Sequence, residues 1–190
     1  MQQLIERIKR DGTVKPGGIL KVDSFLNHLI DTQLCHDMAM EIHNLYAGEN
    51  INKILTIEAS GIGLAVMTGY VFGCPVLFAK KSKSANISDG LYSAEVKSYT
   101  HGNTNTVIVS KEYLNEGDRV LIIDDFLAMG EALEGLCSLV EQAGAEVVGA
   151  AIAVEKAFQP GGARLREKGL RIESLARIAS MSDDSLEFCD

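Results

Sequence analysis

Hydrophobic residues along the chain gather into short runs separated by polar and glycine-rich segments. The runs that we interpret as buried strands cover residues 53–57, 75–79, 120–123, 146–154 and 170–178. Two further strand-like stretches, 94–100 and 106–110, flank a short polar segment. Continuous apolar runs of this length are typical of parallel strands that are covered by helices on both faces.

Helix-period patterns alternate with these strands. Helices are predicted over residues 1–10, about 32–48, 63–71, 130–143 and 163–168. Because the two kinds of element alternate, the sequence predicts an α/β fold with a mainly parallel central sheet flanked by helices. Residues 1–190 are expected to form a single domain.

Three segments break these patterns. Residues 11–20 contain Pro16 and several glycines, so we expect an irregular segment that lies over another part of the molecule rather than in a core layer. Residues 82–105 are predicted to form a mobile two-stranded loop that closes over a ligand. The acidic tail from Asp183 onward is predicted to be loose.

Composition narrows the class of protein. The chain has 190 residues, of which 46% are hydrophobic and 23% charged, values typical of a globular domain rather than a disordered one. Its net charge of −8 argues against a nucleic-acid or anionic-membrane partner, and its apolar runs are too short for a membrane span. The four cysteines lack C-x-x-C spacing, which argues against structural zinc. Residues 1–10 lack a signal-peptide pattern, so we expect a cytoplasmic protein.

Residues 120–132 carry the strongest indication of chemistry. The apolar run ends at Asp124 and Asp125, and we interpret the order as strand, solvent-facing acidic turn, phosphate-sized loop and helix. Open α/β sheets bind ligands at the carboxyl ends of their strands, where two adjacent carboxylates need hydroxyl or cation partners. The amides from Met129 to Ala132 begin a helix and so can bind an anion. The stretch therefore predicts a ribose phosphate as ligand.

This stretch resembles the phosphoribosyl-diphosphate signature of type I phosphoribosyltransferases. The usual signature has Thr or Ser on both sides of the Gly, whereas this chain has Ala128 and Ala132 and adds the charge of Glu131. Backbone amides are then left to hold the 5′-phosphate. The alanine-containing form resembles the xanthine-using members of the family, which usually have Asn where this chain has Met129.

The resemblance implies a role for each of several residues. The catalytic pair would be Asp124 and Asp125. Contacts to phosphoribosyl diphosphate would come from Ala128, Met129, Gly130, Glu131, Ala132, Ser60, Gly61, Lys81, Ser98 and Tyr99. Contacts to the purine would come from Leu20 and Asn27, in an N-terminal hood of about residues 12–30, and from Lys156 and Phe158.

Three more strand ends support this assignment. The strand at 53–57 runs into a small-residue loop, 58–63, and the strand at 75–79 runs into three lysines within residues 80–83. The strand at 146–154 delivers Lys156, whose amine suits the carbonyl of a 6-oxopurine and rejects the amino group of adenine, and Phe158, which can stack on a ring. Each could be an ordinary solvated strand end, and Asn27 could equally satisfy local backbone. Because all of these strand ends are expected at the same edge of the sheet, a ligand-binding site is the favoured interpretation.

The resemblance also implies an activity. It implies conversion of xanthine and 5-phosphoribosyl 1-diphosphate to xanthosine 5′-monophosphate and diphosphate, a reaction of purine salvage. Guanine or hypoxanthine is the alternative base, and a non-catalytic purine regulator that senses phosphoribosyl diphosphate is the alternative kind of protein. The family further implies a homodimer and Mg²⁺ carried by the diphosphate, with no metal site made by the protein alone.

Overall fold

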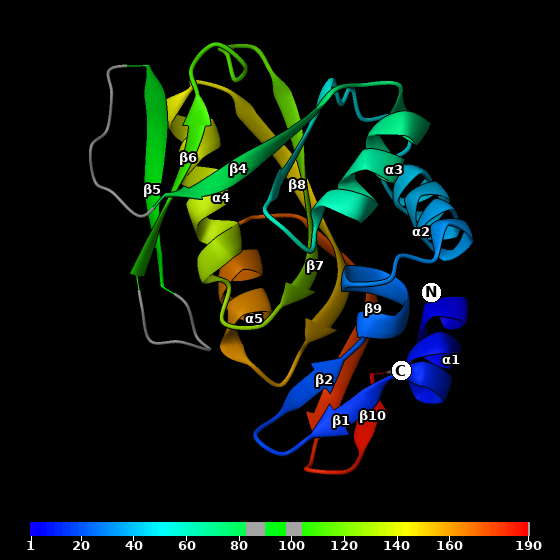
Figure 1. The fold of residues 1–190 in the computed structure, drawn as a ribbon. Helices are drawn as coiled ribbons and strands as arrows, with labels where there is room; N and C mark the ends of the chain where they lie inside the picture. The colour runs from blue at the N-terminus through cyan, green and yellow to red at the C-terminus, as the bar shows by residue number, and fades with distance from the viewer. Residues whose placement is uncertain (83–89, 98–103, 190) are drawn as a thin grey trace.

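A computed structural model of the protein describes residues 1–82, 90–97 and 104–189 (Figure 1). Within them, one sheet of eight strands has the order β10-β9-β8-β7-β3-β4-β6-β5. The strands are β3 (Lys53–Ile57), β4 (Val76–Ser82), β5 (Leu91–Lys97), β6 (Thr104–Ser110), β7 (Arg119–Leu127), β8 (Glu146–Lys156), β9 (Ile172–Met181) and β10 (Leu186–Phe188). Strands from β9 to β4 are parallel, and β10, β6 and β5 are antiparallel additions at the two edges. The mainly parallel sheet is confirmed.

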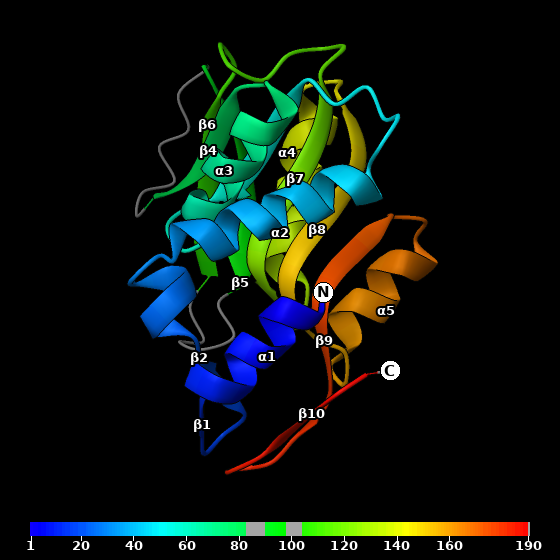
Figure 2. The same cartoon turned by 90° about the vertical axis from the view of Figure 1, so that its right-hand side faces the viewer.

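Helices cover both faces of the sheet (Figures 1 and 2). On one face lie α1 (Gln2–Asp11), α2 (Thr32–Leu45) and α3 (Ile62–Phe72), and on the other lie α4 (Glu131–Gln142) and α5 (Pro160–Glu167). On β7, Leu121 and Ile123 pack into the core of the first face, and Val120 and Ile122 pack beneath α4. Burial on both faces explains why the strand is continuously apolar. No helix in the described part of the chain could cross a membrane.

The N-terminal segment that we predicted to be irregular has regular structure. It forms an antiparallel hairpin of β1 (Thr13–Lys15) and β2 (Ile19–Lys21), followed by the π-helix η1 (Asp23–Asn27). Val22 and Phe25 are fully buried, and Leu20 is 7% exposed. The prediction was wrong because strands of three residues are too short to show an alternating pattern. Figure 1 shows this hood at the end of the sheet toward which β7 and β8 run.

The carboxyl half of the chain differs from the prediction at several places. β7 continues through Asp124 to Leu127, with Asp124 opposite Ile152 of β8, so the predicted acidic turn is part of the strand. The predicted loose tail instead forms β10, which pairs with β9. α5 begins earlier than predicted, at Pro160, because proline suits the first position of a helix. β8 also runs past its predicted end, to Lys156, so β7 and β8 both carry polar residues at the carboxyl end of the sheet.

Candidate active site

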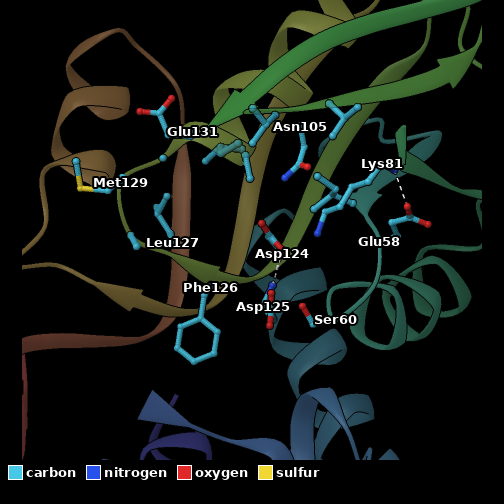
Figure 3. A pocket seen from close by; sticks show the side chains of 17 residues that line it. Glu58, Ser60, Lys81, Asn105, Asp124, Asp125, Phe126, Leu127, Met129 and Glu131 are labelled. Carbon is cyan, nitrogen blue, oxygen red and sulfur yellow. Dashed lines mark hydrogen bonds between the residues drawn. The ribbon is translucent and has the colours of Figure 1, made fainter. Parts of the chain in front are cut away.

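A pocket of about 260 Å³ lies at the carboxyl ends of β3 and β7 (Figure 3). Figure 3 shows the amine of Lys81 directed toward Asp124, while Asp125 and Phe126 extend on the other side, toward the N-terminal ribbon. The residues that sequence assigned to the sugar phosphate and that line the pocket are Ser60, Lys81, Asp124, Asp125, Ala128, Met129, Gly130, Glu131 and Ala132. Ser98 and Tyr99 lie outside the described residues.

The two carboxylates are buried instead of facing solvent as predicted. Asp124 is 5% exposed and Asp125 is 8% exposed, and the backbone N–H of Asp125 donates to Oδ1 of Asp124 over 2.9 Å. Burial, and next the charge of Asp125, raise the pKa of Asp124 well above its usual range, while the charge of Lys81 acts in the opposite direction. A ligand that brings hydroxyl donors or positive charge would therefore stabilise the ionised form of this buried carboxyl group.

The loop before α4 is braced from behind by α5. The N–H of Gly161 donates to the carbonyl of Ala128 over 3.1 Å, and Nη2 of Arg164 donates to the carbonyl of Met129 over 3.0 Å. Because N–H and C=O point in opposite directions across a peptide plane, the amides of Met129 and Gly130 face away from α5. Gly130 has φ +85°, a conformation that favours glycine. The brace therefore leaves an anion-binding row of amides at the pocket.

The loop after β3 lies against the same carboxylate. A Cβ at Gly61 would come within 2.4 Å of Oγ1 of Thr56 and 3.2 Å of Oδ1 of Asp124, so only glycine fits there. Oε1 of Glu58 accepts from the backbone N–H of Lys81 over 2.6 Å. This bond ties the loop to β4 and brings the lysine beside the pocket.

The hood meets the ends of β7 and β8 at the side of the pocket predicted for the purine. Nδ2 of Asn27 donates to Oδ2 of Asp125 over 3.3 Å, and Nζ of Lys156 donates to the carbonyl of Gly18 over 2.8 Å. The same Nζ lies 5.9 Å from the centroid of the Phe126 ring. Burial lowers the pKa of Lys156 below its usual value. Lys156 and the aspartates thus share one edge of the molecule.

Sequence reasoning did not single out Phe126, whose ring lies near Lys156. Phe158, which we expected to stack on the base, is 44% exposed. The predicted site residues that the structure describes but that do not line this pocket are Leu20, Asn27, Gly61, Lys156 and Phe158. Phe126 lines the pocket instead, directly after the aspartate pair. Glu58 and Asn105 also line it and were not predicted. The position of Phe126 beside Asp125 was the one available signal.

Comparison with known proteins agrees with this geometry. Residues 21–168 match the model of the phosphoribosyl transferase domain family. A xanthine phosphoribosyltransferase of Finegoldia magna is 54% identical over 190 residues, which is 100% of each chain. Another, of Limosilactobacillus reuteri, is 51% identical over 188 residues, covering 99% of this chain and 98% of that one. The solved adenine phosphoribosyltransferase of Rhodothermus marinus shares the fold, with a TM-score of 0.74, 23% identity, and coverage of 93% of this chain and 99% of that chain.

Proposed function

Because the chain belongs to the phosphoribosyl transferase family, we infer that it is a pentosyltransferase that converts xanthine and 5-phosphoribosyl 1-diphosphate to xanthosine 5′-monophosphate and diphosphate. Relatives with this activity in their names match it over almost its whole length at 51% and 54% identity. The reaction belongs to purine salvage, because it returns a free base to the nucleotide pool.

The observation that carries this function is that groups suited to a purine and groups suited to a sugar phosphate lie together at the carboxyl end of the sheet. Lys156, an amine suited to an exocyclic oxygen, lies near the ring of Phe126, and the next residue back along β7 is the buried carboxylate Asp125. The braced amide loop lines the pocket that Asp125 and Phe126 also line, and Lys156 lies beside that pocket through its approach to Phe126. An oxopurine, a ribose and a phosphate therefore have complementary groups within reach of one another.

The carboxylates supply the electrostatic part of the mechanism. N9 of xanthine bonds to C1 of the ribose as the bond from C1 to the diphosphate oxygen breaks, and the N9 proton passes to water. Positive charge develops on the ribose ring during this exchange, and Asp124 and Asp125 stabilise it. The amides of Met129 and Gly130 hold the 5′-phosphate, and Lys81 and the loop at Ser60 balance the charge of the departing diphosphate.

Magnesium fits the donors of this pocket. Mg²⁺ prefers oxygen ligands and often binds through one or two carboxylates together with substrate phosphates, and Asp124 and Asp125 supply such oxygens. Within the described residues, no group of three or more His, Cys, Asp or Glu side chains could hold a metal ion. We propose that the diphosphate carries the ion, which would neutralise the leaving group when bound.

We also propose a cytoplasmic homodimer. Val66 and Tyr70 lie one turn apart on α3 and are 54% and 80% exposed, and the Ile30 side chain, 42% exposed, lies against Gly63 at the start of the same helix. A second copy would bury this apolar face against itself. All four cysteines are free thiols, which fits a reducing compartment. We expect Tyr70→Glu to shift the sedimentation velocity of the protein to that of a monomer.

A panel of bases tests the activity. Purified protein is mixed with Mg²⁺, phosphoribosyl diphosphate and xanthine, guanine, hypoxanthine or adenine, and the ultraviolet change on nucleotide formation is followed. We expect the highest kcat/KM for xanthine and the lowest for adenine, because Lys156 donates to an oxygen at purine position 6. A higher kcat/KM for guanine or hypoxanthine would identify the other 6-oxopurine activity, and a preference for adenine would overturn the proposal.

A further inference from the structure

The side chain of Asn27 lies between the two substrate regions. Asn27 ends η1 in the hood, and its Nδ2 donates to Oδ2 of Asp125 across a sequence separation of 98 residues. Because the amide nitrogen is the donor in this bond, the amide oxygen faces the other way. The bond therefore fixes the orientation of the whole amide.

The amide oxygen of Asn27 lacks a hydrogen-bond donor among the residues that the structure describes. Oδ1 of Asn27 is buried and accepts no hydrogen bond from the described part of the chain. A buried polar atom without a partner costs free energy, and such atoms are rare in folded proteins. The other end of the same amide is already bonded, since Nδ2 donates to Asp125. A ligand that carries an N–H group would satisfy this oxygen.

We propose that Asn27 is a positioning residue that couples binding of the base to binding of the sugar phosphate. A ring N–H of the purine donates to Oδ1, and the same amide, held by that bond, keeps the carboxylate of Asp125 in place for the ribose hydroxyls. This inference rests on the proposed function. It adds that Asn27 acts on the sugar through Asp125, in addition to any contact with the base.

Coupling of this kind is reciprocal. If the base raises the affinity for the sugar phosphate by some factor, the sugar phosphate raises the affinity for the base by the same factor. A residue that only packs the hood would leave this factor unchanged. Leu20 provides the matched comparison, because it lies in the same hood and is 7% exposed, but its aliphatic side chain offers Asp125 no hydrogen bond.

Ribose 5-phosphate makes the coupling measurable, because it fills the sugar and phosphate regions but cannot react with xanthine. Its Kd is measured by titration calorimetry with and without saturating xanthine, for the wild type, Asn27→Ala, Asn27→Leu and Leu20→Ala. We expect xanthine to tighten ribose 5-phosphate binding to the wild type by about fivefold or more. Both Asn27 variants should reduce this factor to about one, whereas Leu20→Ala should weaken xanthine binding and keep the factor.

Asn27→Leu has nearly the size of the native side chain and serves if Asn27→Ala does not fold, which thermal unfolding would reveal. An unchanged coupling factor in a folded Asn27 variant would overturn the inference. A wild-type protein that binds xanthine with a coupling factor of one would overturn it too, with the proposed activity intact. Failure of the wild type to bind xanthine even beside saturating ribose 5-phosphate would instead overturn the proposed function.

Discussion

Arg166 and Glu155 are joined by two parallel hydrogen bonds, from Nη1 to Oε1 over 2.7 Å and from Nη2 to Oε2 over 2.8 Å. Glu155 is 1% exposed, and Nε of Arg177 on β9 lies 3.2 Å from the same Oε2. The carboxylate therefore fastens the end of β8, one residue before Lys156, to α5 and to β9.

The first prediction concerns this carboxylate. We expect Glu155→Gln to lower the free energy of unfolding by about 2–3 kcal/mol at pH 7, because the amide leaves two arginines without their charged partner. Urea unfolding measures the change. The control is Glu173→Gln, whose exposed pair with Arg171 should contribute less than about 1 kcal/mol. Equal losses in the two variants would contradict a special role for Glu155.

The same pair predicts a dependence on pH. Burial raises the pKa of Glu155, but the hydrogen bonds of Arg166 and the charges of Arg166 and Arg177 lower it by more, so the net pKa lies below its ordinary value of 4.5. A pKa lowered by folding gives stability that is complete above the unfolded value and is lost as the pH falls through the folded value. The stability difference between the wild type and Glu155→Gln should therefore shrink in acid, below about pH 4. A constant difference would refute this.

For Asp124, we expect stability to depend on pH in the opposite direction. Burial and the charge of Asp125 raise its pKa, so the folded protein binds a proton more tightly there than the unfolded chain, and stability falls as the pH rises above 3.8. We expect Asp124→Asn to raise the melting temperature at pH 7 while lowering kcat by about 100-fold or more. Calorimetry and the ultraviolet assay measure the two effects. A variant that unfolds more easily and keeps its kcat would contradict both assignments.

The two phenylalanines near Lys156 can be compared directly. Phe126 lines the pocket, whereas Phe158 is 44% exposed. We expect Phe126→Ala to raise the KM for xanthine by about tenfold, the effect of losing one aromatic contact. Phe158→Ala should change it by less than about twofold, as surface substitutions usually do. A larger effect from Phe158 would restore the role that sequence suggested for it.

The brace behind the phosphate loop can be removed separately. Arg164 donates to the carbonyl of Met129 and also pairs with Glu134, which Lys168 contacts as well. We expect Arg164→Met to raise the KM for phosphoribosyl diphosphate by about two- to tenfold, the value of one hydrogen bond. Lys168→Met removes a partner of Glu134 but leaves the loop untouched, so its KM should stay at the wild-type value. Equal effects would assign the change to Glu134 instead.

Sequence predicted the parts of the fold that depend on local pattern. The apolar run of residues 120–123 identified a central strand of the sheet, because burial on both faces leaves an unmistakable composition. The same criterion ended the strand too early. Asp124 and Asp125 interrupt the apolar pattern, but the ladder with β8 continues through them because strand pairing depends on the backbone.

Contacts between distant segments could not be predicted in this way. The hydrogen bond between Asn27 and Asp125 depends on how the hood folds over the sheet, and the hood consists of elements too short to show a period. Phe126 directly follows Asp125, and Phe158 lies two residues after Lys156, so both rings stand near polar residues at strand ends. The neighbour of Phe126 is a weak signal that does not establish which ring reaches the pocket. Only the twist and length of β7 and β8 decide this.

The single turn between β8 and α5 serves both halves of the substrate pair, since Lys156 precedes it and Gly161 and Arg164, just beyond it, brace the phosphate loop. A change of base specificity that arises from substitutions in this turn would also affect binding of the sugar phosphate. Any insertion or shift that reshapes the base pocket also moves the anchor of the sugar-phosphate loop, so selection for a new base here would have to repair affinity for the donor substrate at the same time.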